Sequence, residues 1–276
     1  MDSYRAYSFI ILSAILFLLL GVPFFSSAPA SSYFSTPARL TGANTVSSLG
    51  SYNWAGFAIN SSAGSVTQVK GSWVQPSVMC PSTGTQIAAF WVGIDGLTSS
   101  TVEQTGTMAQ CQNGIASYFA WYELFPSPSL TISTLKIQPG NVISASVKYS
   151  ITTGQFTVKI RDVSTSKSFT KSLAVPGAAR SSAEWIEETP SSCGSVTCLY
   201  AMSNFGTISF GKDTTSVLGT NSATISGSTK SISKFGSMVD SLTMVTYPGA
   251  STTMALPSSL SADGTSFSVI WANSGP

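Results

Sequence analysis

Histidine is absent from this chain of 276 residues. Without an imidazole, neither Ser-His-Asp nor Cys-His nucleophilic catalysis is possible. The common zinc hydrolases, which hold their metal through histidine, are excluded for the same reason. Acid–base chemistry would therefore have to use carboxyl or carboxamide groups, and the chain has only 11 acidic residues.

Charge is also scarce, because charged residues make up 9% of the chain against about a quarter in a typical domain. The net charge is only +2, and no run of Lys and Arg occurs, which argues against a nucleic-acid partner. A fold with few carboxylates and no histidine loses little stability on acidification. The composition fits an acidic environment, and it fits an ordinary extracellular Ser/Thr-rich domain equally well.

Two further catalytic signatures are missing. No two glycines lie four residues apart, so there is no Gly-x-Ser-x-Gly nucleophile elbow. Gly206 and Gly211-Lys212 have the spacing of a phosphate-binding loop, but Asp213 stands where Ser or Thr is needed. Chemistry by carboxylate and carboxamide groups is what remains.

The N-terminus has the pattern of a targeting segment. Arg5 precedes a long apolar run over 9–25, and Ala28-Pro-Ala30 fits a small-x-small cleavage site. We expect residues 1–30 to be a signal peptide, with a retained membrane anchor as the alternative. Residues 31–50 are expected to be a short pro-segment or linker, and residues 51–276 to form the folded domain.

The chain has four cysteines, which allow three disulfide connectivities. They are Cys80, Cys111, Cys193 and Cys198. Export favours disulfides, and we expect the pairs Cys193–Cys198 and Cys80–Cys111. A four-cysteine zinc site is the rival, but the chain has no Cys-x-x-Cys pair and secretion argues against it.

Beyond residue 50 the pattern is that of an all-β protein, with short alternating runs separated by Gly, Pro and Asn turns. No amphipathic helix is evident, so we expect a large antiparallel two-sheet sandwich. Residues 211–236 are expected to be a long surface connection. The expected strands are 54–59, 66–74, 87–94, 102–106, 115–125, 142–149, 156–163, 168–175, 183–188, 207–210, 237–246 and 267–271.

Strand alternation gathers polar and aromatic side chains on particular faces. If four of these faces coincide, they line one groove. Each residue taken singly has an ordinary role as well, such as a solvated polar group, a turn former or a core tryptophan. The groove would contain Trp91, Asp95, Gln104, Trp121, Glu123 and Glu184.

Six segments, in order, resemble the glutamic peptidases, or eqolisins. They cover residues 52–190, about half of the chain. The segments are Asn53-Trp-Ala-Gly56, Trp73-Val-Gln-Pro76, Trp91-Val-Gly-Ile-Asp-Gly96, Gln104-Thr-Gly106, Trp121-Tyr-Glu-Leu-Phe-Pro126 and Ala183-Glu-Trp-Ile-Glu187.

The resemblance implies a concanavalin A-like sandwich of two antiparallel sheets and endopeptidase activity at acid pH, with no metal and no cofactor. It places the catalytic dyad on Gln104 and Glu184. It also implies that Trp91 and Asp95 lie near the active site, and that Trp121, Tyr122 and Glu123 lie near the substrate cleft. The expected partners are protein or peptide substrates of a secreted monomer.

The chemistry suits such a dyad. A carboxylate can take a proton from water and return it to the leaving amine, without a covalent intermediate. A neutral carboxamide can donate a hydrogen bond to the developing oxyanion. The sequence-based hypothesis is that Glu184 is the general base and then acid, that Gln104 stabilises the oxyanion, that Glu188 is at most supporting, and that Glu187 points away.

Two alternatives remain open from sequence. A sandwich glycoside hydrolase would need two carboxyls about 5–10 Å apart, for instance Glu123 and Glu184. A carbohydrate-binding or cell-surface module would use the tryptophans as sugar platforms. The group that lies against Glu184 discriminates among them: Gln104 favours a peptidase, and a second carboxyl favours a glycosidase.

Overall fold

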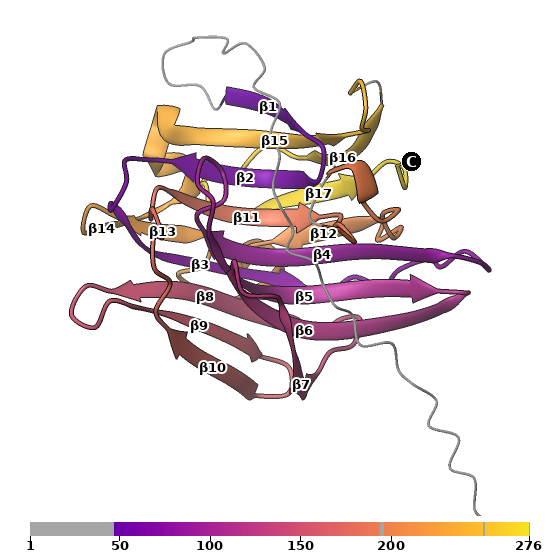
Figure 1. Ribbon diagram of the computed structural model, residues 1–276, viewed down its shortest axis with the longest axis horizontal. Coiled ribbons are helices and arrows are strands. Elements are labelled where there is room, and N and C mark those ends of the chain that lie inside the picture. Colours follow the sequence, from indigo (N-terminus) through magenta and orange to yellow (C-terminus); the bar gives the residue numbers. More distant parts are fainter. Residues whose placement is uncertain (1–46, 194–195, 251, 276) are drawn as a thin grey trace, which may run out of the picture.

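The computed structural model describes residues 47–193, 196–250 and 252–275. These residues form an all-β protein, as predicted, whose strands join in one hydrogen-bonded network (Figure 1). The only α-helix among them is the single turn α1 (Lys212–Thr215), and two 3-10 helices, η1 (Val196–Cys198) and η2 (Ile232–Met238), accompany it. The strands are β1 (Ser47–Ser51), β2 (Trp54–Asn60), β3 (Val66–Val74), β4 (Thr85–Ile94), β5 (Val102–Gln112), β6 (Ile115–Phe125), β7 (Leu130–Lys136), β8 (Val142–Ser150), β9 (Gln155–Asp162), β10 (Lys167–Leu173), β11 (Ser182–Glu188), β12 (Thr207–Phe210), β13 (Ser222–Ile225), β14 (Ser228–Ser231), β15 (Val239–Val245), β16 (Thr253–Pro257) and β17 (Phe267–Trp271).

The first layer of the sandwich runs β1-β15-β2-β11-β4-β5-β6-β7. All of these pairs are antiparallel except β1–β15, which is parallel. β11 therefore lies between β2 and β4, far from both in sequence, and these strands cross the front of Figure 1 side by side.

The second layer runs β10-β9-β8-β3, and β3 continues to both β13 and β12. The path β12-β17-β16 then returns to β15 of the first layer. This return joins the two layers along one side, so the sheet curls back over itself.

The main core lies between the layers and consists of the inward side chains of both. Buried tryptophans also connect the layers by hydrogen bonds. The indole of Trp185 in β11 donates to the carbonyl of Lys70 in β3 (2.8 Å), and that of Trp73 in β3 donates to the hydroxyl of Thr107 in β5 (2.9 Å). Buried indole N–H groups need such partners, so these bonds fix how the layers face each other.

A second apolar cluster covers the other face of the first layer, on the side away from the main core. Trp54, Trp91, Trp121, Ile186 and Leu242 are buried there. Leu49, Met108 and Phe125 are partly buried at its border. The outer face of an antiparallel layer is commonly polar and exposed to water, whereas this outer face packs tryptophans. The polar candidate site lies on this same face.

Each of the twelve predicted strands is present, with different ends in places. The prediction for 211–236 was wrong, because this Ser/Thr/Gly-rich stretch contains α1, β13, β14 and η2 and pairs with β3. β7 and β16 were not predicted. Residues 47–50 of the predicted linker form most of β1, while residues 1–46, with the predicted signal segment, lie outside the described residues.

Both predicted disulfides are present, Cys80–Cys111 and Cys193–Cys198. The first closes a loop of sequence separation 31 around the β4–β5 hairpin, and the second closes one of 5. Within the described part of the chain, no helix has the length and apolar character needed to cross a bilayer.

Candidate active site

Strand register brings the predicted polar faces together. Glu184 of β11 pairs with Gly93 of β4, Gly93 pairs with Gln104 of β5, and Gln104 pairs with Glu123 of β6. Directly paired residues project from the same side of a sheet. The predicted coincidence of these faces is therefore confirmed, and it occurs on the face that carries the second apolar cluster.

Tryptophans fill the next row of the same face. Ile186, Trp91, Gly106 and Trp121 are paired across the same four strands. The ring of Trp91 leans over Gly93, where a Cβ atom would come within 2.8 Å of it. Gly93 is required there because it leaves room for an indole beside the polar row.

Gln104 is held by Glu123. Its amide nitrogen Nε2 donates a 2.7 Å hydrogen bond to Oε2 of Glu123, and both side chains are almost fully buried. The oxygen Oε1 of Gln104 is buried without a hydrogen-bond partner. The pKa of Glu123 is raised to about 7 by desolvation, which the bond from Gln104 and a backbone bond from Ser129 oppose.

Glu188 is a further buried carboxyl on the same face of β11, two rows away from Glu184. Oε2 of Glu188 accepts from the indole of Trp91 (2.9 Å), and Oε1 accepts from the amide of Asn53 (3.3 Å). Desolvation first, and then repulsion from Glu123, raise the pKa of Glu188 to about 8, against the hydrogen bonds from Trp54, Trp91 and Asn53. Gln104, Glu123 and Glu188 thus form one interacting group.

Glu184 has different neighbours. It is fully buried, and desolvation raises its pKa well above the usual value, with Ser182 opposing the shift and Asp95 and Glu103 adding to it. The amide of Gln104 donates to Glu123 and not to Glu184. The sequence hypothesis expected Gln104 against Glu184; the two share a face and a row, but the described hydrogen bonds do not join them.

Asp95 has a structural position. Its carboxylate accepts bonds from the backbone N–H groups of Arg180 (2.6 Å) and Ser181 (2.8 Å). The hydroxyls of Ser181 and Thr101 add two longer bonds. Asp95 therefore ties the end of β4 to the segment that leads into β11, and it fixes the register on which the site depends.

Tyr122 lies on the opposite face of β6 from Glu123, as alternation requires. Its ring stacks on Phe169 of β10 at 5.3 Å between centroids, and it packs against the main core. Tyr122 thus faces the main core and not the row that carries Gln104, and its expected place near the substrate cleft stays a prediction. Trp91 and Trp121, by contrast, lie on the site face.

Glu187 points away from the site, as predicted. It faces the interior between Ala55 and Phe90, its register partners. Both of its carboxyl oxygens are buried without a hydrogen-bond partner. Desolvation, and then Glu188, raise the pKa of this carboxyl well above its usual value.

Sequence reasoning did not name Asn53 and Trp54 among the candidate site residues, and it gave Glu188 at most a supporting role. Asn53 and Trp54 open one of the six segments that carry the resemblance, so their presence there was the available signal. Their position became clear only from the pairing of β2 with β11, in which Trp54 lies opposite Glu188.

The arrangement can move protons in a dry setting. One carboxyl with a raised pKa, Glu123, is hydrogen-bonded to a neutral carboxamide, and hydrogen-bond donors hold a second one, Glu188, in place. Protons on such groups remain available at acid pH, and a carboxamide can donate to developing negative charge. This is a set of groups suited to hydrolysis of an amide without a nucleophilic side chain.

Comparison with known proteins shows that this fold belongs to the glutamic peptidases, a class of hydrolases. Residues 52–255 match the Peptidase A4 family. The match covers most of the chain, and the protein belongs to this family.

Relatives support the same placement. The chain is 33% identical over 181 residues to aspergillopepsin-2 of Aspergillus niger, which is 58% of this chain and 62% of that protein. It therefore spans less than two thirds of that relative's length. Aspergilloglutamic peptidase from Aspergillus niger has a similar structure, with a TM-score of 0.54 and 27% identity over 68% of this chain and 99% of that one. Scytalido-glutamic peptidase, solved with a transition state analog inhibitor, shares the fold, with a TM-score of 0.62 and 22% identity over 80% of this chain and 98% of that one.

Proposed function

We propose that this protein is a secreted acid endopeptidase in which Gln104 and Glu188 act as the catalytic pair. Family membership supports a peptidase that acts on proteins. One observation supports the choice of residues: Glu188 is held by hydrogen bonds from Trp91 and Asn53, and it interacts electrostatically with Glu123, the carboxyl that holds Gln104. In this proposal Glu188 replaces Glu184, the residue assigned from sequence.

The raised pKa of Glu188 determines the order of the proton transfers. At acid pH Glu188 carries its proton, so it can donate to the carbonyl oxygen of the substrate while water attacks the carbonyl carbon. The resulting carboxylate takes a proton from the attacking water. In the second step it gives that proton to the amide nitrogen, and the C–N bond of the diol intermediate breaks. The amine leaves, and one hydroxyl of the former diol returns a proton to Glu188, which leaves a carboxylic acid.

Gln104 stabilises the charge that develops on the substrate oxygen. A carboxamide nitrogen has two donors, and Glu123 uses one of them, which leaves the second for the substrate. Because Glu123 fixes the amide plane before substrate arrives, little reorganisation is needed in the reaction. Removing one such donor typically lowers the rate by about 10²–10³-fold.

Secretion agrees with the two disulfides, which persist in oxidising compartments. An acidic setting agrees with the site carboxyls, whose raised pKa values keep them neutral and therefore inexpensive to bury at low pH. The glycoside hydrolase and the binding module remain less supported, because the family match favours neither.

The test is digestion of a denatured protein at pH about 3–4 by the wild type and by Glu188→Gln, Gln104→Ala and Glu184→Gln, each checked for folding by circular dichroism. We expect Glu188→Gln to lose at least about 10²–10⁴-fold in kcat/KM, and Gln104→Ala to lose about 10²–10³-fold. Glu184→Gln should keep most of the activity. If Glu184→Gln folded but was inactive while Glu188→Gln stayed active, Glu184 and not Glu188 would be the catalytic glutamate.

A further inference from the structure

A basic pocket lies on the outer face of the second layer, away from the proposed active site. It has a volume of about 260 Å³. Three cations line it, Lys70 of β3 and Lys159 and Arg161 of β9, together with the hydroxyl residues Ser144 and Ser146 of β8. No carboxylate lines it.

The strand register explains why these cations meet. Lys70 pairs with Ser146, and Ser146 pairs with Lys159, so the three form one row across β3, β8 and β9. Arg161 lies in the next row, opposite Ser144. From sheet geometry, the Cα atoms of Lys159 and Arg161 are about 7 Å apart, and those of Lys70 and Lys159 about 10 Å apart. The positions are scattered in sequence, so no basic run reveals them.

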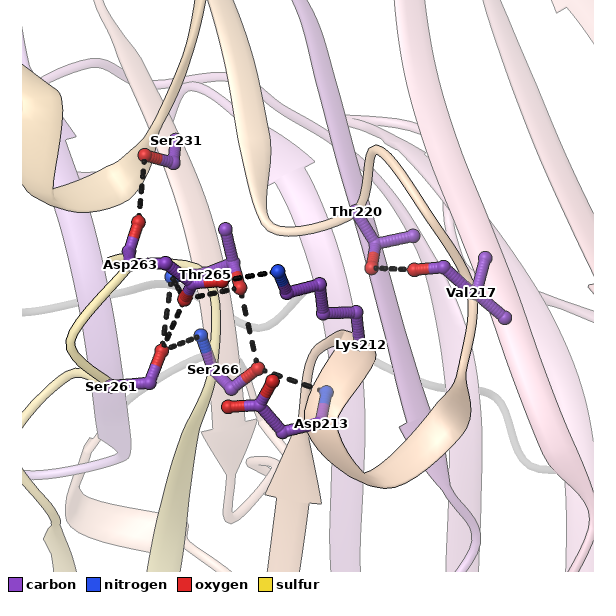
Figure 2. Close-up of polar contacts among 9 residues, drawn as sticks. All are labelled: Lys212, Asp213, Val217, Thr220, Ser231, Ser261, Asp263, Thr265 and Ser266. Carbon is purple, nitrogen blue, oxygen red and sulfur yellow. Dashed lines mark hydrogen bonds and ion pairs between the residues drawn. The ribbon is translucent and has the colours of Figure 1, made fainter.

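One side of the pocket is formed by a loop that hydrogen bonds hold in place. The loop 217–220 after α1 closes one side, and Ser72 of β3 anchors this loop by hydrogen bonds with the hydroxyls of Thr215 (2.7 Å) and Thr220 (2.9 Å). Thr220 in turn donates to the carbonyl of Val217 (2.9 Å), a bond that Figure 2 shows. The loop is thus fixed to the strand that carries Lys70.

The neighbouring cation Lys212 makes a useful contrast. It forms an ion pair with Asp263, which Figure 2 shows on the other side of α1. Lys70, Lys159 and Arg161 form no ion pair with the carboxylates of the described residues. Three like charges at this spacing repel one another unless an anion lies between them.

We propose that this pocket binds a tetrahedral oxyanion, the sulfate or phosphate group of a ligand. Lysine and arginine donors converge on it from two strands, and an arginine fork and serine hydroxyls match the geometry of such a group. Sulfate and phosphate monoesters keep negative charge at acid pH, whereas carboxylates lose much of theirs. The source is either the free ion or a sulfated or phosphorylated polymer, and the experiment separates the two.

The test compares the wild type with the triple variant Lys70→Gln, Lys159→Gln, Arg161→Gln at pH 4. A matched control, Lys167→Gln, Lys171→Gln, Lys234→Gln, removes the same charge elsewhere. Thermal unfolding is followed in sodium sulfate and in sodium phosphate, each against sodium chloride of equal ionic strength. Because sulfate stabilises many proteins without a site, the readout is the difference between variants.

We expect these oxyanions to raise the Tm of the wild type and of the control more than that of the triple variant, with apparent affinity at least about tenfold weaker in the triple variant. Retention on immobilised dextran sulfate, but not on dextran, would identify a polymer as the source. Equal oxyanion responses in all three proteins would overturn the proposal. Peptidase activity should be the same in all three, so the outcome does not depend on the proposed catalytic function.

Discussion

At the scale of single residues, the decisive feature is the coupling between Glu123 and Glu188. Glu123 orients Gln104 through a hydrogen bond, and its charge raises the pKa of Glu188. Two carboxyls that interact in this way titrate as a pair. Glu123 therefore affects both members of the proposed catalytic pair, Gln104 and Glu188.

This coupling predicts the effect of Glu123→Gln on the pH profile. With its pKa of about 7, Glu123 is already neutral at acid pH, so the amide should leave activity there nearly unchanged. Above neutrality the wild-type Glu123 ionises and repels the charged form of Glu188, whereas the amide of the variant cannot ionise. Glu188 therefore loses its proton at a lower pH in the variant than in the wild type. The alkaline limb of kcat/KM should move to lower pH, measured on a soluble peptide substrate. If the alkaline limb stayed at the same pH while kcat/KM at acid pH was unchanged, the two carboxyls would not be coupled.

The choice between Glu184 and Glu188 shows the limit of sequence reasoning at this scale. Alternation correctly places both on one face, four residues apart, which is about 13 Å along a strand. It cannot say which of the two is held by Asn53 and Trp91, because that depends on register with strands distant in sequence. Asn53 and Trp54 meet Glu188 only through such a pairing.

At the scale of elements, close approach of β4 and β5 places Gln104 beside the tryptophans. Gly106 makes this approach possible. A Cβ atom on Gly106 would lie 2.1 Å from the carbonyl oxygen of Phe90 and 2.6 Å from Cβ of Trp91. Neither contact can be relieved by turning a flexible side-chain end.

Gly106→Ala should therefore destabilise the protein by about 1–3 kcal/mol or more, the usual cost of overpacking, and should lower activity because the strands must separate beside the site. Denaturant unfolding measures the first effect and peptide hydrolysis the second. Gly50→Ala in β1 is the matched control, since its nearest neighbour would be an ordinary contact at 3.9 Å. Similar unfolding free energies for both variants would contradict the steric argument.

The strands that sequence reasoning found and missed differ in a physical way. Strands with large inward side chains, such as β9, show clean alternation between buried and exposed positions. β13 and β14 are rich in Ser and Thr; β13 pairs with β3 and adds only Ala223 and Ile225 to the main core, and β14 pairs with β13 and adds none. Backbone pairing leaves no hydrophobic pattern in the sequence, so these short strands resembled a surface connection.

At the scale of the whole molecule, eight of the ten described carboxyls are buried, and only Asp213 and Asp263 are exposed. The raised pKa values of Glu123, Glu188 and Glu103, about 7, 8 and 9, mean that the folded state binds protons more tightly than the unfolded state. Folding stability is then full below the unfolded pKa near 4.5 and falls as pH rises toward the folded values.

The Tm should therefore be highest at about pH 3–4 and should fall continuously between about pH 4.5 and 9, which calorimetry or circular dichroism would measure. The loss should amount to several kcal/mol, since one pKa unit corresponds to about 1.4 kcal/mol. Glu187→Leu, which removes one buried carboxyl from the interior, should flatten the fall. A Tm that rose from pH 4 to pH 7 would contradict this account.

The burial of most carboxyls also affects the solubility of the protein at acid pH. Most proteins pass through their isoelectric point as a solution is acidified, and near zero net charge they attract one another and precipitate. Here the surface of the described domain carries lysine and arginine with almost no exposed acid to offset them. Acidification leaves the sign of the surface charge unchanged, so neighbouring molecules should repel one another and stay dispersed under the conditions in which other proteins unfold and aggregate.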